Sequence, residues 1–214
     1  DYIEDGFAAE DKTGPEYYAP SRPSICEAEA VFRILSFAKT LDCPMYIVHV
    51  SSWEALQVIE MFRGWSSAPI YAETCTHYLT LTNEQMLEMG SLAKVSPPLR
   101  EARDVDALWQ AVIDGKIDDV GADTAGHLIE TKEPRFGDVF KAPAGLPGQE
   151  TMFTVTYDEG FNRRAVSLCR LVELMAEKPA KIFGLYPRKG VLQPGSDGDV
   201  LIFDPMREHT VSAA

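Results

Sequence analysis

The chain lacks any apolar run long enough to cross a membrane, since a transmembrane helix needs about eighteen apolar residues or more and no such stretch occurs. The first residues also lack the basic start and the apolar stretch of a secretion signal. Residues 1–16 are instead acidic and are interrupted by glycine and proline. We therefore expect a cytoplasmic protein that does not bind a membrane.

Positive charge is scarce relative to negative charge. The 20 lysine and arginine residues are outnumbered by 33 aspartate and glutamate residues, which gives a formal net charge of -13 at pH 7. A surface of this sign repels the phosphate backbone of DNA and RNA. We therefore do not expect nucleic acid as a partner, and the spread of the acidic residues along the chain indicates solvated helix faces.

Cysteine is also rare, and its spacing excludes two classes of small domain. The four cysteines form no C-x-x-C pair, and they are Cys26, Cys43, Cys75 and Cys169. Neither a zinc ribbon nor a disulfide framework is indicated, so we expect buried free thiols in a reducing compartment. The remaining composition, 45% hydrophobic and 25% charged, is typical of a soluble globular protein.

Helical and strand-like segments alternate through the first part of the chain. The predicted helices cover residues 24–42, 51–65, 82–90 and 104–115, and the predicted strands cover residues 44–50, 68–75 and 117–123. Ser24 is expected to cap the first helix, with Glu27 three residues later. Strands that are apolar almost throughout and separated by helices favour a parallel sheet that helices cover on both faces.

Beyond residue 123 the pattern changes. Residues 142–150 are rich in turn-forming residues, residues 165–184 have helical periodicity, and residues 190–205 are typical of a β-hairpin in another layer of structure. A closed eight-stranded α/β barrel needs roughly 250 residues. With only three barrel-like strands, the chain forms either a small open sheet or part of a larger protein.

Polar residues cluster where the three predicted strands end. His49 follows the first strand, Glu73 and His77 end the second, and Asp123 and His127 follow the third. The carboxyl ends of parallel strands meet at one edge of a sheet, and imidazole and carboxylate are suitable ligands for a divalent metal. Each residue also has a structural alternative: a core histidine, a capping aspartate, a glutamate paired with a cation, or surface histidines.

Five segments, taken together and in order, resemble one family of enzymes. They are "YIVHVSS", "AETCTHYLTLT", "VSPPLREARDVDALWQAVIDGKIDDVGAD", "APAGLPGQET" and "EKPAKIFGLYPRKGVLQPGSDGDVLIFDP". Over nearly the whole chain they are similar to the hydantoinase and dihydropyrimidinase family of cyclic amidohydrolases. The segment "GADTAGHLIETKEPRFGDVFKAPAG" most resembles the branch that acts on 5-substituted hydantoins.

The resemblance implies an α/β fold of a particular kind. It is a partial TIM (β/α)8 barrel of the metal-dependent amidohydrolase type, contributing the last three strands, with part of a β-sandwich domain at the C-terminus. Residues 1–184 would be the C-terminal half of the barrel, and residues 185–214 would start the C-terminal segment of the β-sandwich. The His-x-His, lysine and histidine of the family's first, fourth and fifth strands have no counterpart here. We therefore expect an incomplete chain that alone binds no metal pair and is inactive.

The resemblance also implies a metal site. The family holds two divalent metal ions, normally Zn²⁺, bridged by a carboxylated lysine that would lie outside this chain. His49 falls on the metal-ligand histidine of the sixth strand. Asp123 falls on the aspartate of the eighth strand, which binds metal and transfers protons in catalysis.

Two further residues correspond to substrate-binding positions. Ser96 falls on a residue whose main chain holds the cyclic amide, and Ala144 falls where the family often has asparagine. A second departure is Thr124, which stands where the family usually has histidine directly after the aspartate. A main-chain contact at residue 144 would survive the first change, whereas a side-chain contact would not.

The expected activity is hydrolysis of the cyclic amide bond of hydantoins or dihydropyrimidines, by a homo-oligomer (tetramer or dimer). Two alternatives stay open. Dihydroorotase and allantoinase share related forms of "AETCTHYL" and "SPPLR". Collapsin response mediators use the same barrel without metal ligands, as scaffolds, but a scaffold has no need for His49 and Asp123.

Overall fold

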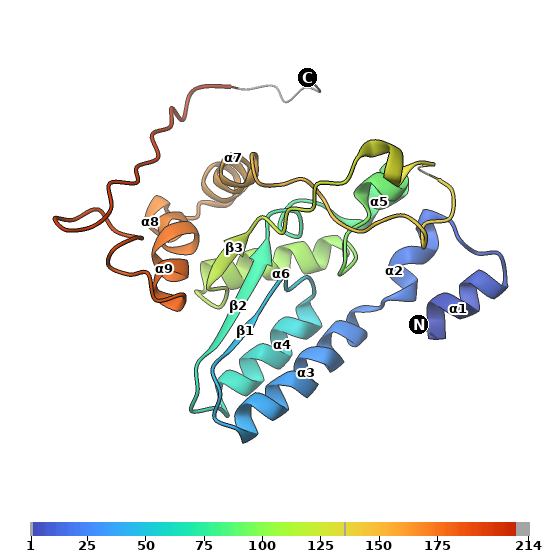
Figure 1. Ribbon diagram of the computed structural model, residues 1–214, viewed down its shortest axis with the longest axis horizontal. Coiled ribbons are helices and arrows are strands. Elements are labelled where there is room, and N and C mark those ends of the chain that lie inside the picture. The colour runs from blue at the N-terminus through green and yellow to red at the C-terminus, as the bar shows by residue number, and fades with distance from the viewer. Residues whose placement is uncertain (1, 135, 209–214) are drawn as a thin grey trace.

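A computed structural model describes residues 2–134 and 136–208 of the chain. At its centre lies a parallel sheet with the strand order β1-β2-β3 (Figure 1). The strands are β1 (Met45–Ile47), β2 (Ile70–Cys75) and β3 (Asp119–Gly121). The parallel sheet predicted from the sequence is therefore confirmed, although each strand is shorter than its apolar segment.

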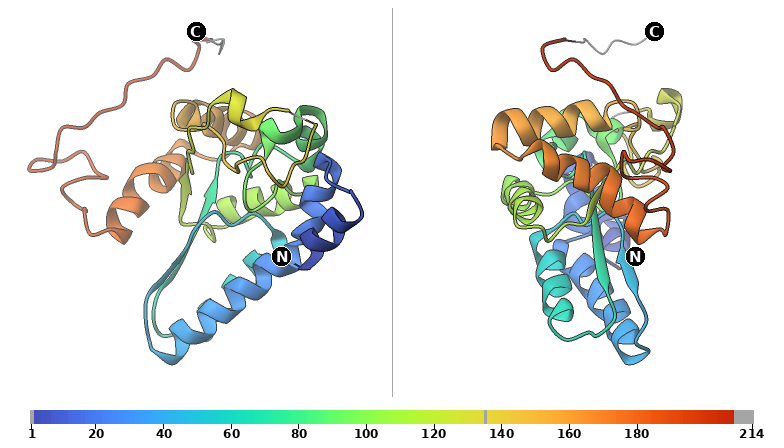
Figure 2. Two further views of the ribbon diagram at one scale, coloured as in Figure 1. Left: turned by 45° about the vertical axis from the view of Figure 1, so that its right-hand side comes forward. Right: turned by 90° about the vertical axis from the view of Figure 1, so that its left-hand side faces the viewer.

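Helices alternate with these strands in the predicted order. They are α3 (Ser24–Thr40), α4 (Trp53–Arg63), α5 (Asn83–Met89) and α6 (Ala102–Ile113). Helices α3 and α4 lie side by side next to the sheet (Figures 1 and 2). Their buried residues, such as Leu35 and Ile59, join Leu108 of α6 in one hydrophobic core. None of the described helices is both long and apolar enough to cross a bilayer.

The side chains of β2 divide the sheet into two faces. Ile70, Ala72 and Thr74 are buried, whereas Tyr71 and Glu73 between them are only partly buried. Successive side chains of a strand point to opposite faces, so the buried set faces the helical layer. Glu73 therefore lies on the opposite face of the sheet. The polar residues that follow the strands continue from this face at the carboxyl ends of the strands.

The starts of the helices agree only in part with the sequence. Ser52 caps α4 by accepting a hydrogen bond from the Ala55 N–H, as its position before the apolar periodicity suggests. The expected cap at Ser24 is wrong, because Pro23 is the N-cap of α3 and Ser24 is the first helical residue. Glu27 instead turns toward the loop after β1, where it accepts hydrogen bonds from Ser51.

The first residues form helices, although their acidic, glycine-containing sequence suggests an irregular segment. They form α1 (Tyr2–Ala9), a 3-10 turn at Pro15–Tyr17 and α2 (Tyr18–Ser21). No residue of α1 is buried. An ion pair between Glu4 and Arg22 connects this helix to the rest of the chain.

The C-terminal part differs most from the expectation. The predicted helical segment, residues 165–184, is present as α8 (Leu168–Val172) and α9 (Lys178–Ile182), with a π-helical turn between them, whereas α7 (Met152–Tyr157) precedes this segment and was not predicted. The predicted β-hairpin does not form, because the described residues after 182 contain no strand. A lone two-stranded hairpin is marginally stable in water, and the described residues place no further strand beside it. The last six residues of the predicted β-sandwich segment (185–214), residues 209–214, lie outside the described residues.

Candidate metal and substrate site

His49 and Asp123 each stand two residues beyond a strand, in an unusual backbone conformation. The φ angle is 44° at His49 and 43° at Asp123. Left-handed φ values are unfavourable for residues other than glycine, and such strain is concentrated at functional sites. Both side chains are at least partly accessible, and neither forms a hydrogen bond with the described residues. They therefore behave neither as a satisfied core histidine nor as a capping aspartate.

His77 lies near both of these residues. Burial lowers the pKa of the His77 imidazole to about 4, the negative charge of Asp123 partly opposes this, and the charge of His49 adds to it. Within the described part of the chain, the buried Nε2 atom of His77 has no hydrogen-bond partner. The ring is therefore neutral near pH 7, which is the form that binds a metal.

Cys75 completes a compact group of possible ligands. One ligand atom of each of Cys75, His77 and Asp123 lies within 4.8 Å of the others. From the sequence, Cys75 is expected only as a buried free thiol, and it is indeed free and buried. The other three cysteines are exposed, contrary to that expectation. Burial and the nearby charge of Glu73 raise the pKa of the Cys75 thiol.

Next to this group on the sheet, the carboxyl groups of Glu73 and Asp119 both contact the hydroxyl group of Tyr46. The Tyr46 hydroxyl lies 2.6 Å from Glu73 Oε2 and 2.9 Å from both oxygens of Asp119. Burial, assisted by the charge of Glu73, raises the pKa of Asp119 to about 7 although the Tyr46 hydroxyl opposes the shift. Glu73 is thus held by a hydroxyl group and not by the cation that the sequence suggested as an alternative. A Cβ atom at Gly121 would come 2.9 Å from the Glu73 carboxyl carbon, so a larger residue at this position would displace the carboxylate of Glu73.

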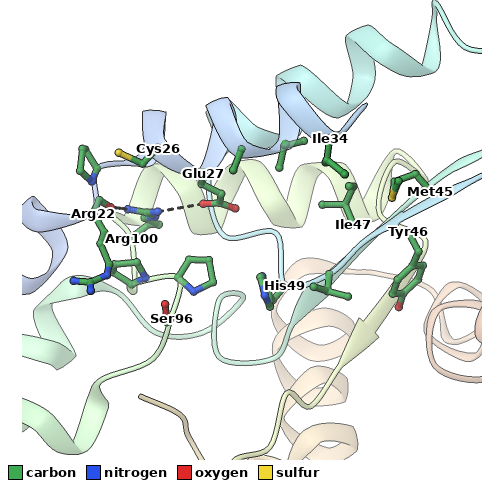
Figure 3. A pocket seen from close by; sticks show the side chains of 16 residues that line it. Arg22, Cys26, Glu27, Ile34, Met45, Tyr46, Ile47, His49, Ser96 and Arg100 are labelled. Atoms are coloured by element: carbon green, nitrogen blue, oxygen red, sulfur yellow. Dashed lines mark hydrogen bonds and ion pairs between the residues drawn. The ribbon is translucent and has the colours of Figure 1, made fainter. Parts of the chain in front are cut away.

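The first predicted substrate position, Ser96, is exposed and precedes a cis peptide bond to Pro97. It lines a groove of about 470 Å³ that also contains His49 (Figure 3). The structure therefore places a predicted metal ligand and a predicted substrate residue on one groove. A cyclic amide is small enough to fit a groove of this size.

The second predicted substrate position, Ala144, lies in a turn-rich loop beside the third strand. Its carbonyl oxygen is 3.0 Å from Nε2 of His127. The Gly148 N–H donates to Thr124 Oγ1 at 3.2 Å, and the Gly145 N–H donates to the Lys94 carbonyl at 2.9 Å. Thr124 thus has a structural role in this chain, because its side chain fixes the loop that carries Ala144. His127 contacts that loop and is not one of the grouped possible ligands.

Arg100, the last residue of the "SPPLR" motif, supports the groove through contacts that no local pattern in the sequence indicates. Its buried guanidinium donates to Glu27 Oε2 at 3.2 Å (Figure 3) and also to Ser51 Oγ at 3.1 Å. Ser51 lies two residues after His49, and Ser96 lies four residues before Arg100. The ion pair therefore connects α3 to both segments that form the groove.

The residues present fit a divalent metal. Imidazole and carboxylate are common zinc ligands, and the buried nitrogen of His77 without a partner marks a place where a polar ligand is missing. Tyr46 and Glu73 lie beneath the same strand ends. Hydrogen-bonded carboxylates behind a metal site are typical, because they orient the groups that bind the metal.

No family model matches the chain. Individual proteins of known function do match it, and they agree with one another. The D-hydantoinase of Ralstonia pickettii is 41% identical over 216 residues, covering 99% of this chain and 47% of that protein. The D-phenylhydantoinase of Escherichia coli O1:K1 / APEC is 39% identical over 208 residues, covering 96% of this chain and 45% of that protein.

Solved structures agree with these relatives. The D-hydantoinase (dihydropyrimidinase) of Thermus sp. superposes with a TM-score of 0.89 at 34% identity, covering 92% of this chain and 44% of that chain. The L-hydantoinase (dihydropyrimidinase) of Arthrobacter aurescens gives a TM-score of 0.88 at 37% identity, with the same coverage. The chain thus spans a little less than half the length of the relatives it matches. Over nearly all of its own length, it is homologous to part of the hydantoinases and dihydropyrimidinases.

Proposed function

We propose that the chain forms the last three strands of a (β/α)8 amidohydrolase barrel. Residues 1–184 would supply this half of the barrel, and residues 185–214 would begin the C-terminal segment of a β-sandwich. The parallel order β1-β2-β3 and the similarity to D-hydantoinase structures support the proposal. In such barrels the catalytic residues stand at the carboxyl ends of the strands, where His49 and Asp123 lie.

The complete protein, we infer, hydrolyses the cyclic amide bond of hydantoins or dihydropyrimidines. The observation that carries this function is the placement of His49 and Asp123. Both stand at the same edge of the sheet in a left-handed backbone conformation, and both charges act on His77. The D-hydantoinase and D-phenylhydantoinase relatives support a 5-substituted hydantoin as the substrate.

His49 and Asp123 would hold part of a pair of divalent metal ions, for which we propose Zn²⁺, with the remaining ligands outside this chain. When bound, the metal pair supplies an activated water at neutral pH and polarises the amide carbonyl. Asp123 has an accessible carboxylate without a hydrogen bond in the described residues. It can therefore receive a proton from the attacking water and pass it to the leaving ring nitrogen.

Ser96 and Ala144 would position the ring through main-chain groups. The Gly145 N–H donates to the carbonyl of Lys94, so the two substrate-binding segments are connected close to the site. A fixed separation between them would keep the attacked carbon in place, which lowers the entropic cost of reaction. The small side chain of Ala144 leaves room for a substituent on the ring.

The proposed partners are a small cyclic amide and further copies of the same protein, in the cytoplasm. Three large apolar side chains after Asp123 are exposed and support oligomer formation: Leu128 (70%), Ile129 (61%) and Phe136 (62%). Isolated surface apolar residues are common, but a cluster in one loop is typical of an interface. The net charge of -13 and the helices observed give no support for nucleic acid or a membrane as a partner.

Segment replacement tests this function. This chain would replace the homologous segment of the Ralstonia pickettii D-hydantoinase, and turnover of 5-phenylhydantoin, dihydrouracil and allantoin would be compared. We expect the hydantoin to be the best substrate and Asp123→Asn to lower kcat by about 10²–10⁴-fold, because it removes a general acid–base. Asp106→Asn, at an exposed position of α6, is the matched control and should leave kcat unchanged.

The result also separates the rival functions. Faster turnover of dihydrouracil or allantoin would assign the chain to one of the related hydrolases. A folded, metal-free hybrid without activity on any of the three compounds would support the scaffold alternative. His49→Ala should lower the metal content of an active hybrid, and an unchanged metal content would remove His49 from the ligand set.

A further inference from the structure

The carboxyl ends of β2 and β3 bring together three side chains that can each bind a metal. Ligand atoms of Cys75, His77 and Asp123 all lie within 4.8 Å of one another. Cys75 pairs directly with Gly121 across the sheet, and His77 and Asp123 each lie two residues further along their segments. Gly121 has no side chain to separate the strand ends, so the three groups can share one space.

His77 provides an independent indication of a ligand. Its side chain is 7% exposed, and its Nε2 atom has no hydrogen-bond partner in the part of the chain described. A buried polar atom without a partner is costly and is rare in native proteins. The imidazole is held in place, because its ring packs against Tyr78 at 4.2 Å between centroids and the Tyr78 hydroxyl donates to the Pro97 carbonyl.

The distances suit a small thiophilic cation. Bonds from zinc to nitrogen, oxygen and sulfur are about 2.0–2.3 Å, so the ligands of a tetrahedral site lie roughly 3.3–3.8 Å apart. The observed group therefore has to close by no more than about 1–1.5 Å between its most distant atoms. Asp123 can supply this movement because its side chain is exposed, whereas Cys75 and His77 are fixed by packing.

We propose that Cys75, His77 and Asp123 form a mononuclear site for a thiophilic divalent cation such as Zn²⁺ or Cd²⁺, with a fourth position open to water. A mixed sulfur, nitrogen and oxygen set favours these cations over Mg²⁺ or Ca²⁺. On binding, the metal–sulfur bond replaces the S–H bond, and the thiol proton is released to solvent.

This site goes beyond the proposed hydrolysis. The resemblance assigns a ligand role to neither Cys75 nor His77, and all three donors lie within this chain. Because Asp123 is shared with the proposed catalytic site, a cation held by the thiolate would withdraw that carboxylate from proton transfer. The chain would then bind one cation by itself although it lacks the residues for a catalytic pair.

Cadmium binding tests the proposal in the 214-residue chain. The background variant is Cys26→Ser/Cys43→Ser/Cys169→Ser, which removes three exposed thiols and leaves Cys75 as the only one. Titration with Cd²⁺ is followed by the ultraviolet charge-transfer band of cadmium–thiolate bonds and by calorimetry. We expect one Cd²⁺ per chain and a band that saturates at that ratio.

Single substitutions in the background variant then identify the ligands. Cys75→Ser should abolish the band, and His77→Gln and Asp123→Asn should each weaken the affinity at least about tenfold. Asp106→Asn, also exposed, should leave the affinity unchanged. Far-ultraviolet circular dichroism checks the fold, and Asp123→Asn removes a ligand without disturbing the core.

Two results would overturn the proposal. One is the absence of a cadmium–thiolate band in the folded background variant. The other is an unchanged affinity in both His77→Gln and Asp123→Asn. Neither measurement depends on hydantoin turnover, so the site can fail while the proposed hydrolysis holds, and the reverse is equally possible.

Discussion

Backbone strain at single residues accompanies the proposed chemistry in this chain. His49 and Asp123 are two of the five described residues other than glycine that have a positive φ angle. At Asp123 the exposed side chain gains no packing that would offset the strain. The conformation instead turns the Asp123 carboxylate toward Cys75 and His77.

This strain predicts an unusual order of stability at position 123. We expect Asp123→Gly to be more stable than Asp123→Ala by about 1 kcal/mol, because glycine adopts positive φ without a steric penalty. At Asp106 in α6 the order should reverse by a similar amount, because glycine is a poor helix former. Urea unfolding of the four variants measures both differences. Equal stability of the two variants at position 123 would show that the backbone there is not strained.

A second residue-scale prediction concerns Asp119, whose pKa is raised from an ordinary value of 3.8 to about 7. Between these pH values the folded protein keeps a proton that the unfolded chain has released, so ionisation of Asp119 lowers stability as pH rises. Asp119→Asn removes this effect and can still accept a hydrogen bond from Tyr46. We expect its free energy of unfolding, relative to the natural chain, to increase by about 1–3 kcal/mol between pH 4 and pH 8.

Urea unfolding at several pH values measures this difference directly. Comparison with the natural chain is essential, since the lowered pKa of His77 acts in the opposite direction over part of the same range. Asp106→Asn provides the control, because an exposed aspartate should give a difference that does not vary with pH. If Asp119→Asn also gave a constant difference, its carboxyl group would have an ordinary pKa in the folded chain.

At the scale of elements, one buried ion pair joins helix α3 to the loops that form the groove. The side chains of Arg100 and Glu27 are 8% and 10% exposed, and Ser51 shares the network. We expect Glu27→Ala to destabilise the chain by about 3–5 kcal/mol, because it leaves the guanidinium buried without its carboxylate. Glu27→Ala/Arg100→Met should lose less than the sum of the single changes.

A double-mutant cycle in urea measures the coupling between the two residues. Helix α3 also contains a matched exposed pair, Glu29 and Arg33, whose side chains are 62% and 63% exposed. Its coupling should be no more than about 0.5 kcal/mol. Similar couplings for the two pairs would mean that burial of Arg100 adds nothing to the strength of its ion pair.

The order of the elements follows from the sequence because local signals determine it. Apolar periodicity placed the strands and helices between Ser24 and Gly121, although it missed α1 and α2. The strand ends indicated several polar residues, and the family resemblance selected His49 and Asp123 among them. Long-range contacts were not predictable in this way. Glu27 resembles part of a helix cap but binds Arg100, and Cys75 joins the possible ligands only because β2 pairs with β3.

The C-terminal segment shows a different limit. Its short apolar runs between turn-forming residues are typical of a hairpin, yet Val200, Leu201 and Ile202 are exposed and form no strand. Such a run forms a strand only where a neighbouring strand accepts its hydrogen bonds. That neighbour depends on the rest of the molecule, so the local pattern alone predicted the wrong structure.

At the scale of the whole molecule, the three-stranded sheet has two open edges, β1 and β3. His49 lies at the end of the edge strand β1, beside a groove lined by apolar residues such as Ile34 and Val48 (Figure 3). Relatives are about twice as long as the aligned segment, since it covers 47% of the Ralstonia pickettii protein. A complementary half-barrel would both cover this groove and supply further ligands.

We therefore expect the 214-residue chain alone to hold no metal pair and to leave 5-phenylhydantoin unhydrolysed. Mixing it with the part of the Ralstonia pickettii D-hydantoinase that precedes the homologous segment should restore turnover, because on the proposed fold the two parts together would make a whole barrel. Hydrolysis is followed by the loss of the ring amide, and bound metal by elemental analysis after gel filtration. Val48→Asp should prevent association of the two parts by burying a charge directly after the edge strand β1, whereas Asp106→Asn should not. Full activity and two bound metal ions in the isolated chain would contradict this account, since every metal ligand would then have to come from this chain.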